Sequence, residues 1–133
     1  MVPDFVDTSF LVAELNPRDP LHFKAQALRR INLPLLTSEL VLIEFLNAFA
    51  SGRHRQAVLE RTQAILSDPS IIVVRCSHQM FAEALDLFAR RPDKGWSLTD
   101  CASFLIMRSE RMTRALTADS HFRQAGFTAL MLD

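Results

Sequence analysis

Short apolar segments alternate with longer segments of helical periodicity, and this alternation constrains the fold more than any other feature of the chain. The strand-like runs span residues 3–6, 33–37, 71–74, 114–118 and 128–132. Between them, apolar residues recur at three- and four-residue spacing over 8–15, 19–30, 38–51, 55–67, 77–91, 97–111 and 119–125. Strands that alternate with helices form parallel sheets with both faces covered. The sequence therefore predicts an α/β fold around a parallel sheet.

The length and the cysteines bound the class of protein. A chain of 133 residues is most simply one domain, spanning 1–133. Cys76 and Cys101 match no metal or redox spacing, and two unpaired thiols indicate a reducing, cytoplasmic location. The longest apolar stretch, 40–50, is interrupted by a glutamate and an asparagine, which argues against a membrane span.

Charge and motif content exclude several function classes. Fifteen basic residues balance fifteen acidic ones, so the chain lacks the cationic field typical of non-specific nucleic-acid binders. Its three glycines form neither a Walker loop nor a dinucleotide-binding fingerprint, and there is no nucleophile elbow. None of the four histidines stands at a zinc-ligand spacing. The candidate functional groups that remain are the carboxylates of the acidic residues.

Four acidic residues are candidate functional residues because of their positions in the sequence. Asp7 and Asp119 each follow a strand-like run, and Asp100 lies three residues after Ser97, which is the spacing of a capping box. Each of these three is also explained as a helix-capping residue. Glu44 is different, because it lies in the middle of a helical segment that is apolar nearly all round. A buried carboxylate needs a partner, and either a metal ion or a distant arginine would supply one.

The four acids together predict a metal site. The carboxyl ends of parallel strands lie at one edge of the sheet, where α/β proteins bind their ligands. Four carboxylates that converge there need a counter-charge, and hard oxygen ligands suit Mg²⁺ or Mn²⁺. Such ions activate water and neutralise charge on a phosphoryl group. The pattern indicates metal-assisted hydrolysis of a phosphate ester, with nuclease and phosphatase as the two leading options.

Four segments resemble the motifs of PIN-domain ribonucleases, and most closely the toxins of VapBC-type toxin–antitoxin pairs. In chain order they are FVDTSFLVA (5–13), LLTSELVLIEFLNAF (35–49), DKGWSLTDCASFLIM (93–107) and ALTADSHFRQAGF (115–127). The resemblance extends over essentially the whole chain. It implies a three-layer α/β/α sandwich with a central parallel sheet of four or five strands. It also implies a Mg²⁺- or Mn²⁺-dependent endoribonuclease that hydrolyses RNA phosphodiester bonds with metal-activated water.

The resemblance also assigns residue roles. The catalytic residues and metal ligands it implies are Asp7, Glu44, Asp100 and Asp119. Residues expected to support these carboxylates are Thr8, Ser9, Asn47 and Thr117. Candidate substrate contacts are Lys94, Arg53, Arg55 and His121, although the sequence favours a structural histidine at position 121.

The partners expected by this resemblance are an RNA substrate, a small antitoxin protein and a second copy of the chain in a homodimer. Three alternatives stay open from the sequence. The first is a catalytically silent PIN-like module that binds RNA or protein. The second is a housekeeping RNA-processing nuclease. The third is a small phosphatase or a DNA nuclease with the same metal chemistry.

Overall fold

A computed structural model describes residues 1–31 and 34–132, and its centre is a five-stranded parallel sheet. The strand order is β3-β2-β1-β4-β5, and all four neighbouring pairs are parallel. The strands are β1 (Asp4–Val6), β2 (Leu35–Ser38), β3 (Ile71–Val74), β4 (Arg114–Leu116) and β5 (Thr128–Ala129). The predicted α/β fold class is confirmed.

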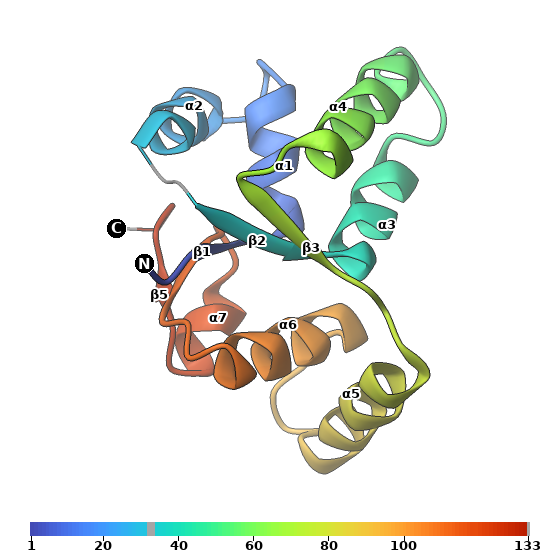
Figure 1. The fold of residues 1–133 in the computed structure, drawn as a ribbon, viewed down its shortest axis with the longest axis vertical. Helices are drawn as coiled ribbons and strands as arrows, with labels where there is room; N and C mark the ends of the chain where they lie inside the picture. The colour runs from blue at the N-terminus through green and yellow to red at the C-terminus, as the bar shows by residue number, and fades with distance from the viewer. Residues whose placement is uncertain (32–33, 133) are drawn as a thin grey trace.

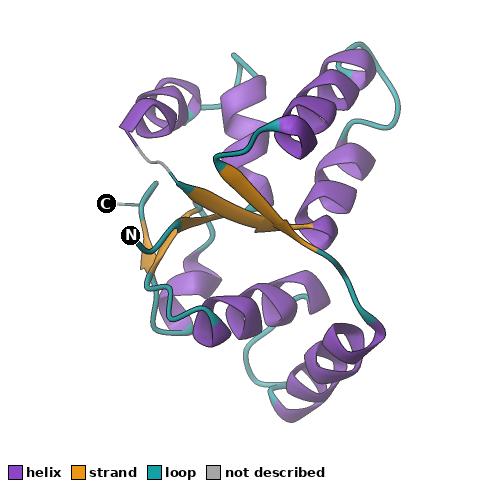
Figure 2. Ribbon diagram, in the orientation of Figure 1, coloured by secondary structure: helices purple, strands orange, loops and turns teal. Residues whose placement is uncertain are grey.

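Helices cover both faces of this sheet and make the molecule a three-layer sandwich (Figures 1 and 2). On one side lie α1 (Thr8–Leu15), α2 (His22–Ile31), α3 (Glu39–Ala48) and α4 (Arg55–Ser67). On the other side lie α5 (His78–Arg90), α6 (Leu98–Ser109) and α7 (Ser120–Gln124). Within the described residues, no helix has both the length and the apolar character needed to cross a membrane.

The predicted segments each contain an observed element, and the differences lie at their ends. The helical pattern at 19–30 begins as a helix only at His22, because the Asp19 carboxylate accepts a hydrogen bond from the Leu21 amide and forms a turn before it. The pattern at 38–51 ends as a helix at Ala48. The strand predicted over 33–37 is observed from Leu35, and its first residue lies outside the described part of the chain.

The register of the central strands determines which residues meet at the carboxyl edge of the sheet. Phe5 pairs with Ala115 and Val6 with Leu116. The residues that follow these strands, Asp7 and Thr117, therefore emerge side by side. Consistent with this, the Asp7 amide donates to the Leu116 carbonyl at 3.1 Å.

An aromatic cluster fixes α6 and α7 against the sheet. The rings of Phe104 on α6 and Phe122 on α7 meet edge to face with centroids 4.9 Å apart, and Phe122 lies 6.2 Å from Phe5 of β1. Trp96 packs edge to face on Phe104, and its indole nitrogen donates to Gln124 at 3.2 Å. These buried contacts set the spacing between the starts of α6 and α7, where two of the candidate acids lie.

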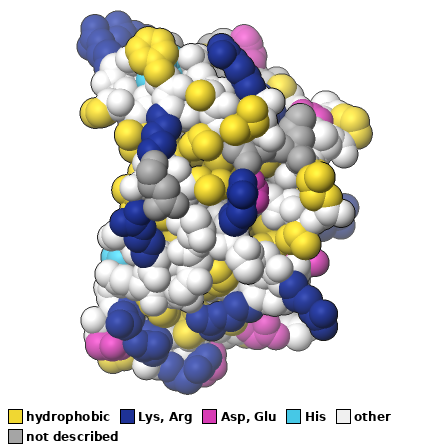
Figure 3. All heavy atoms as spheres, turned by 90° about the vertical axis from the view of Figure 1, so that its left-hand side faces the viewer, with side chains coloured by type: hydrophobic (Ala, Val, Ile, Leu, Met, Phe, Trp, Pro, Cys, Tyr) yellow, Lys and Arg dark blue, Asp and Glu magenta, His cyan; other side chains and the backbone are white. Residues whose placement is uncertain are grey.

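The side of the molecule that carries both termini bears basic side chains spread among apolar and acidic ones (Figure 3). Several arginines of the described chain have a structural explanation, because arginines in the last turn of a helix favour the negative end of its dipole. Arg29 and Arg30 lie in the last turn of α2, and Arg108 lies in the last turn of α6. Arg114 forms a two-pronged ion pair with Asp4.

Candidate active site

Asp7 lies between β1 and α1 and is held by hydroxyl groups. It occupies the N-cap position of α1, but its carboxylate makes no capping hydrogen bond. Instead, Thr117 Oγ1 donates to Asp7 Oδ2 at 2.7 Å, and Ser9 Oγ donates to the same oxygen at 3.0 Å. The carboxylate is thus oriented from α1 and from the end of β4 at once.

Burial makes the negative charge of Asp7 unfavourable. The loss of solvent raises the pKa of Asp7 from 3.8 to about 6, against the lowering effect of the Thr117 hydroxyl, the Thr8 amide and the Ser9 hydroxyl. Repulsion from Asp100 raises the pKa of Asp7 further, so the two carboxylates interact across the site. A cation placed beside Asp7 would remove this cost.

Glu44 comes from α3 on the same side of the sheet, and its partner is a hydroxyl. Thr8 Oγ1 donates to Glu44 Oε1 at 2.7 Å, which ties the glutamate to the residue beside Asp7. The expectation that Glu44 lies in a helix buried nearly all round is wrong. Ile43 is 49% exposed, Asn47 is exposed and Glu44 is half-buried. The helix covers the core with one face, and Glu44 lies at its margin.

Asp100 lies in the first turn of α6 and belongs to the capping box that the sequence predicts. Its amide donates to Ser97 Oγ at 3.0 Å, and its Oδ2 accepts from the Ser97 amide at 3.1 Å. The same oxygen lies 3.0 Å from His121 Nδ1. Burial and repulsion from Asp119 raise the pKa of Asp100. Asp100 therefore both caps α6 and faces the other acids.

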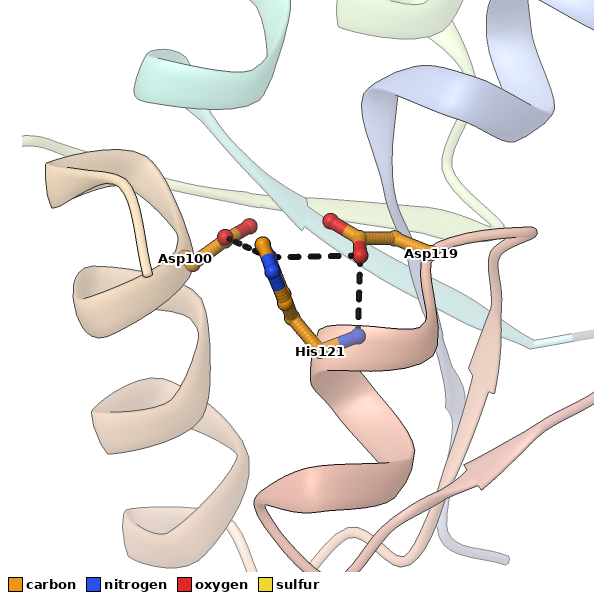
Figure 4. A group of neighbouring side chains, drawn as sticks. All are labelled: Asp100, Asp119 and His121. Atoms are coloured by element: carbon orange, nitrogen blue, oxygen red, sulfur yellow. Dashed lines mark hydrogen bonds and ion pairs between the residues drawn. The ribbon is translucent and has the colours of Figure 1, made fainter. Parts of the chain in front are cut away.

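Asp119 and His121 complete the arrangement from the start of α7 (Figure 4). Asp119 Oδ1 accepts from the His121 amide at 2.9 Å and caps α7. The His121 ring lies between the carboxylates of Asp100 and Asp119, with Nδ1 3.3 Å from Asp119 Oδ1. One potential ligand atom from each of these three residues falls within 4.8 Å of the others. Thr117 Oγ1 accepts from the Asp119 amide and so links this group to Asp7.

The four carboxylates share one feature that bears on metal binding. In each of them, the hydrogen bonds from the hydroxyl, amide and imidazole groups described above fall on a single oxygen. These oxygens are Asp7 Oδ2, Glu44 Oε1, Asp100 Oδ2 and Asp119 Oδ1. Oriented, hard oxygen donors beside charges that burial disfavours fit a divalent cation such as Mg²⁺ or Mn²⁺.

The remaining sequence-predicted residues form no hydrogen bond with this group among those described. Asn47 is exposed and forms no hydrogen bond with Glu44 among those described. Arg55 donates to the Ala50 carbonyl in the loop after α3, and Arg53 in the same loop is exposed. Lys94 is half-buried in the loop before α6. Their expected substrate contacts stay predictions.

The structure places the His121 ring between two of the acids, a position that the sequence did not predict. From the sequence, a histidine two residues after an acid is more simply a structural residue than a substrate contact. The available signal was its place in the first turn of α7, directly after a strand-end aspartate. The partner across the gap, Asp100, is 21 residues away in the chain.

Comparisons with known proteins agree with this geometry. The family model described as "PIN domain" matches residues 5–128. A curated relative, the 23S rRNA-specific endonuclease VapC20 of Mycobacterium tuberculosis, is 32% identical over 92% of this chain and 94% of its own length. The crystal structure of Mycobacterium tuberculosis VapC20, described as a sarcin–ricin loop cleaving toxin, has 27% sequence identity. It superposes with a TM-score of 0.85 over 93% of this chain and 95% of that one. The chain belongs to the PIN-domain family.

Proposed function

We propose that this protein is a divalent-metal-dependent endoribonuclease that hydrolyses phosphodiester bonds in RNA. The observation that carries the proposal is the cluster of Asp100, Asp119 and His121, which each offer one potential ligand atom within 4.8 Å of the others. The Thr117 hydroxyl links this cluster to Asp7. Membership of the PIN-domain family and the nuclease activity named for its relative support the same reaction.

The proposed roles follow from these positions. Asp7, Glu44, Asp100 and Asp119 hold one or two divalent cations, for which Mg²⁺ and Mn²⁺ are the candidates because all four ligands are carboxylates. When bound, such a cation supplies charge neutralisation at the phosphodiester and a nucleophilic water at neutral pH. The hydroxyls of Thr8, Ser9 and Thr117 keep three of these carboxylates oriented, directly or through a backbone amide.

Substrate contacts are proposed on the rim of the site. Lys94 lies in the loop before α6, Arg53 lies in the loop after α3, and Arg55 begins α4, so α3 and α6, which each contribute an acid, have cations nearby in the chain. Lysine and arginine are the side chains that most often contact RNA phosphates, and such contacts position the strand without reading its sequence. Asn47 is proposed to support Glu44 one helical turn away.

The wider biological setting is proposed from the relatives. We propose a single-domain cytoplasmic toxin, spanning 1–133, that a small antitoxin protein neutralises and that forms a homodimer. The two free cysteines are compatible with a reducing compartment. Since the VapC20 relative is described as cleaving the sarcin–ricin loop of 23S rRNA, that RNA stem-loop is the first substrate to test.

The test is cleavage of a sarcin–ricin loop RNA and of a DNA of the same sequence. We expect the wild type to cleave the RNA with Mn²⁺ or Mg²⁺, and chelation by EDTA to abolish cleavage. Asp7→Asn should be inactive, while the surface control Asp86→Asn should cleave like the wild type. RNA binding without cleavage would indicate the silent module instead. Equal cleavage of DNA, or cleavage indifferent to EDTA and Asp7→Asn, would contradict the proposal.

A further inference from the structure

Among the described residues, His121 is the one side chain that contacts two of the four acidic side chains. We propose that His121 is a positioning residue, whose Nδ1–H holds Asp100 and Asp119 in the spacing that the divalent cation requires. This inference rests on the metal-dependent function proposed above and adds a role for a side chain outside the ligand set.

The direction of the hydrogen bond follows from the two partners. Ionised carboxylates only accept hydrogen bonds, so an imidazole nitrogen between two of them must carry the hydrogen. Nδ1 lies 3.0 Å from Asp100 Oδ2 and 3.3 Å from Asp119 Oδ1, so one N–H is shared between them, with the shorter bond to Asp100. Nδ1 therefore acts as a donor to the carboxylates and is not free to bind a cation.

The imidazole is held in this place by the fold. The His121 amide donates to Asp119 Oδ1 at 2.9 Å, which fixes the backbone beneath the ring. The next residue, Phe122, is fully buried against Phe104. Phe104 lies one helical turn after Asp100 on α6. The packing that joins α6 to α7 thus also sets the gap that His121 spans.

The bond to Asp100 matters because that carboxylate has few other constraints. Without the His121 imidazole, Asp100 Oδ2 would keep only the Ser97 amide among the described donors, and Asp119 Oδ1 only the backbone amide of residue 121. The two like charges repel each other, and no donor would then span them. Groups that orient metal-binding carboxylates typically change metal affinity 10- to 100-fold when removed.

The test compares three variants by Mn²⁺ binding, measured from the electron paramagnetic resonance signal of free Mn²⁺. His121→Ala removes the donor, and His121→Asn keeps an N–H at the position of Nδ1. His78→Ala is the control, because His78 is an exposed histidine at the first position of another helix, α5. We expect about 10-fold weaker binding for His121→Ala and binding within about threefold of wild type for His121→Asn and His78→Ala. Circular dichroism and thermal melting check that each variant folds, which the 31% exposure of the His121 side chain favours.

Three results would overturn the inference. His121→Ala could bind Mn²⁺ as tightly as the wild type, or His121→Asn as weakly as His121→Ala. Alternatively, electron spin echo spectra of the wild type could show ¹⁴N coupling from a coordinated imidazole, which would make His121 a ligand. In all three cases Mn²⁺ binding and its loss in Asp7→Asn would persist, so the proposed function would stand. A wild type that binds no Mn²⁺ would refute both.

Discussion

Replacing Asp7 by Asn should stabilise the metal-free protein at neutral pH while abolishing its proposed activity. Asp7 is 6% exposed, and its carboxylate lies in a site where burial disfavours the charge. Asparagine has the same shape, and its carbonyl oxygen can accept the hydroxyl hydrogen bonds of Thr117 and Ser9 that now reach Asp7 Oδ2. The substitution therefore removes the buried charge and keeps the contacts.

The magnitude follows from the pKa of Asp7, which the folded state raises from 3.8 to about 6. The folded protein binds the proton of the Asp7 carboxyl more tightly than the unfolded chain does. The stability that this proton contributes is therefore fully present below pH 3.8 and is lost as the pH rises through 6. At about 1.36 kcal/mol per pKa unit, the wild type loses about 3 kcal/mol by pH 7.5. Asp7→Asn should avoid this loss, and about 2 kcal/mol of its advantage should disappear at pH 4.5.

The assay is urea denaturation in EDTA at pH 7.5 and pH 4.5, followed by circular dichroism. The quantity compared is the difference in the free energy of unfolding between Asp7→Asn and the wild type, in which other titrating groups cancel. Asp86→Asn is the control, because Asp86 is exposed and pairs with Arg90 on α5, and its effect should stay below about 0.5 kcal/mol at both pH values. A stability difference for Asp7→Asn that is zero, or that does not change with pH, would refute the reasoning.

Three further predictions concern the scaffold. Arg111, the residue after the C-cap of α6, has a φ of 57°, a left-handed conformation that favours glycine. Arg111→Gly should therefore raise the free energy of unfolding by about 1 kcal/mol in urea denaturation. Ser97→Ala should lower it by about 1 kcal/mol, because the Asp100 amide loses its capping acceptor. Mn²⁺ affinity should stay unchanged, because the Ser97 backbone amide that donates to the Asp100 carboxylate remains, and a weaker affinity would contradict this reasoning. Arg61 contacts Glu14 through two nitrogens at 3.0 and 3.2 Å, and a double-mutant cycle should give a coupling of about 1 kcal/mol that falls in high salt.

The capping positions show what the sequence could and could not predict about the site. Three acids stand at helix starts, and the local pattern explains each of them as a cap. For Asp100 and Asp119 this prediction is confirmed, since both carboxylates accept capping hydrogen bonds. For Asp7 it is not, because hydroxyl donors take the place of the helix amides. One of those donors, Thr117, is 110 residues away in the chain, so the residues around Asp7 in the sequence cannot predict this hydrogen bond.

Helix α3 shows the same limit for burial. Its periodicity predicted a helix correctly, since spacing depends only on neighbours in the chain. Its nearly continuous apolar composition suggested burial on all sides, yet Ile43 is half exposed and Glu44 lies at the margin. Exposed apolar residues are common on folded proteins, so composition alone does not tell which face a neighbouring layer covers. That depends on how α1 and α4 pack against the helix.

The strand order has a consequence for how the protein is synthesised. β1 leads the chain but occupies the middle of the sheet, where one of its two neighbours is β4, formed by Arg114–Leu116. The nearest hydroxyl to Asp7 and the fourth acid both follow that late strand. A nascent chain therefore cannot complete the pairing of β1, or place Thr117 and Asp119 beside Asp7, before β4 and the residues after it have been synthesised.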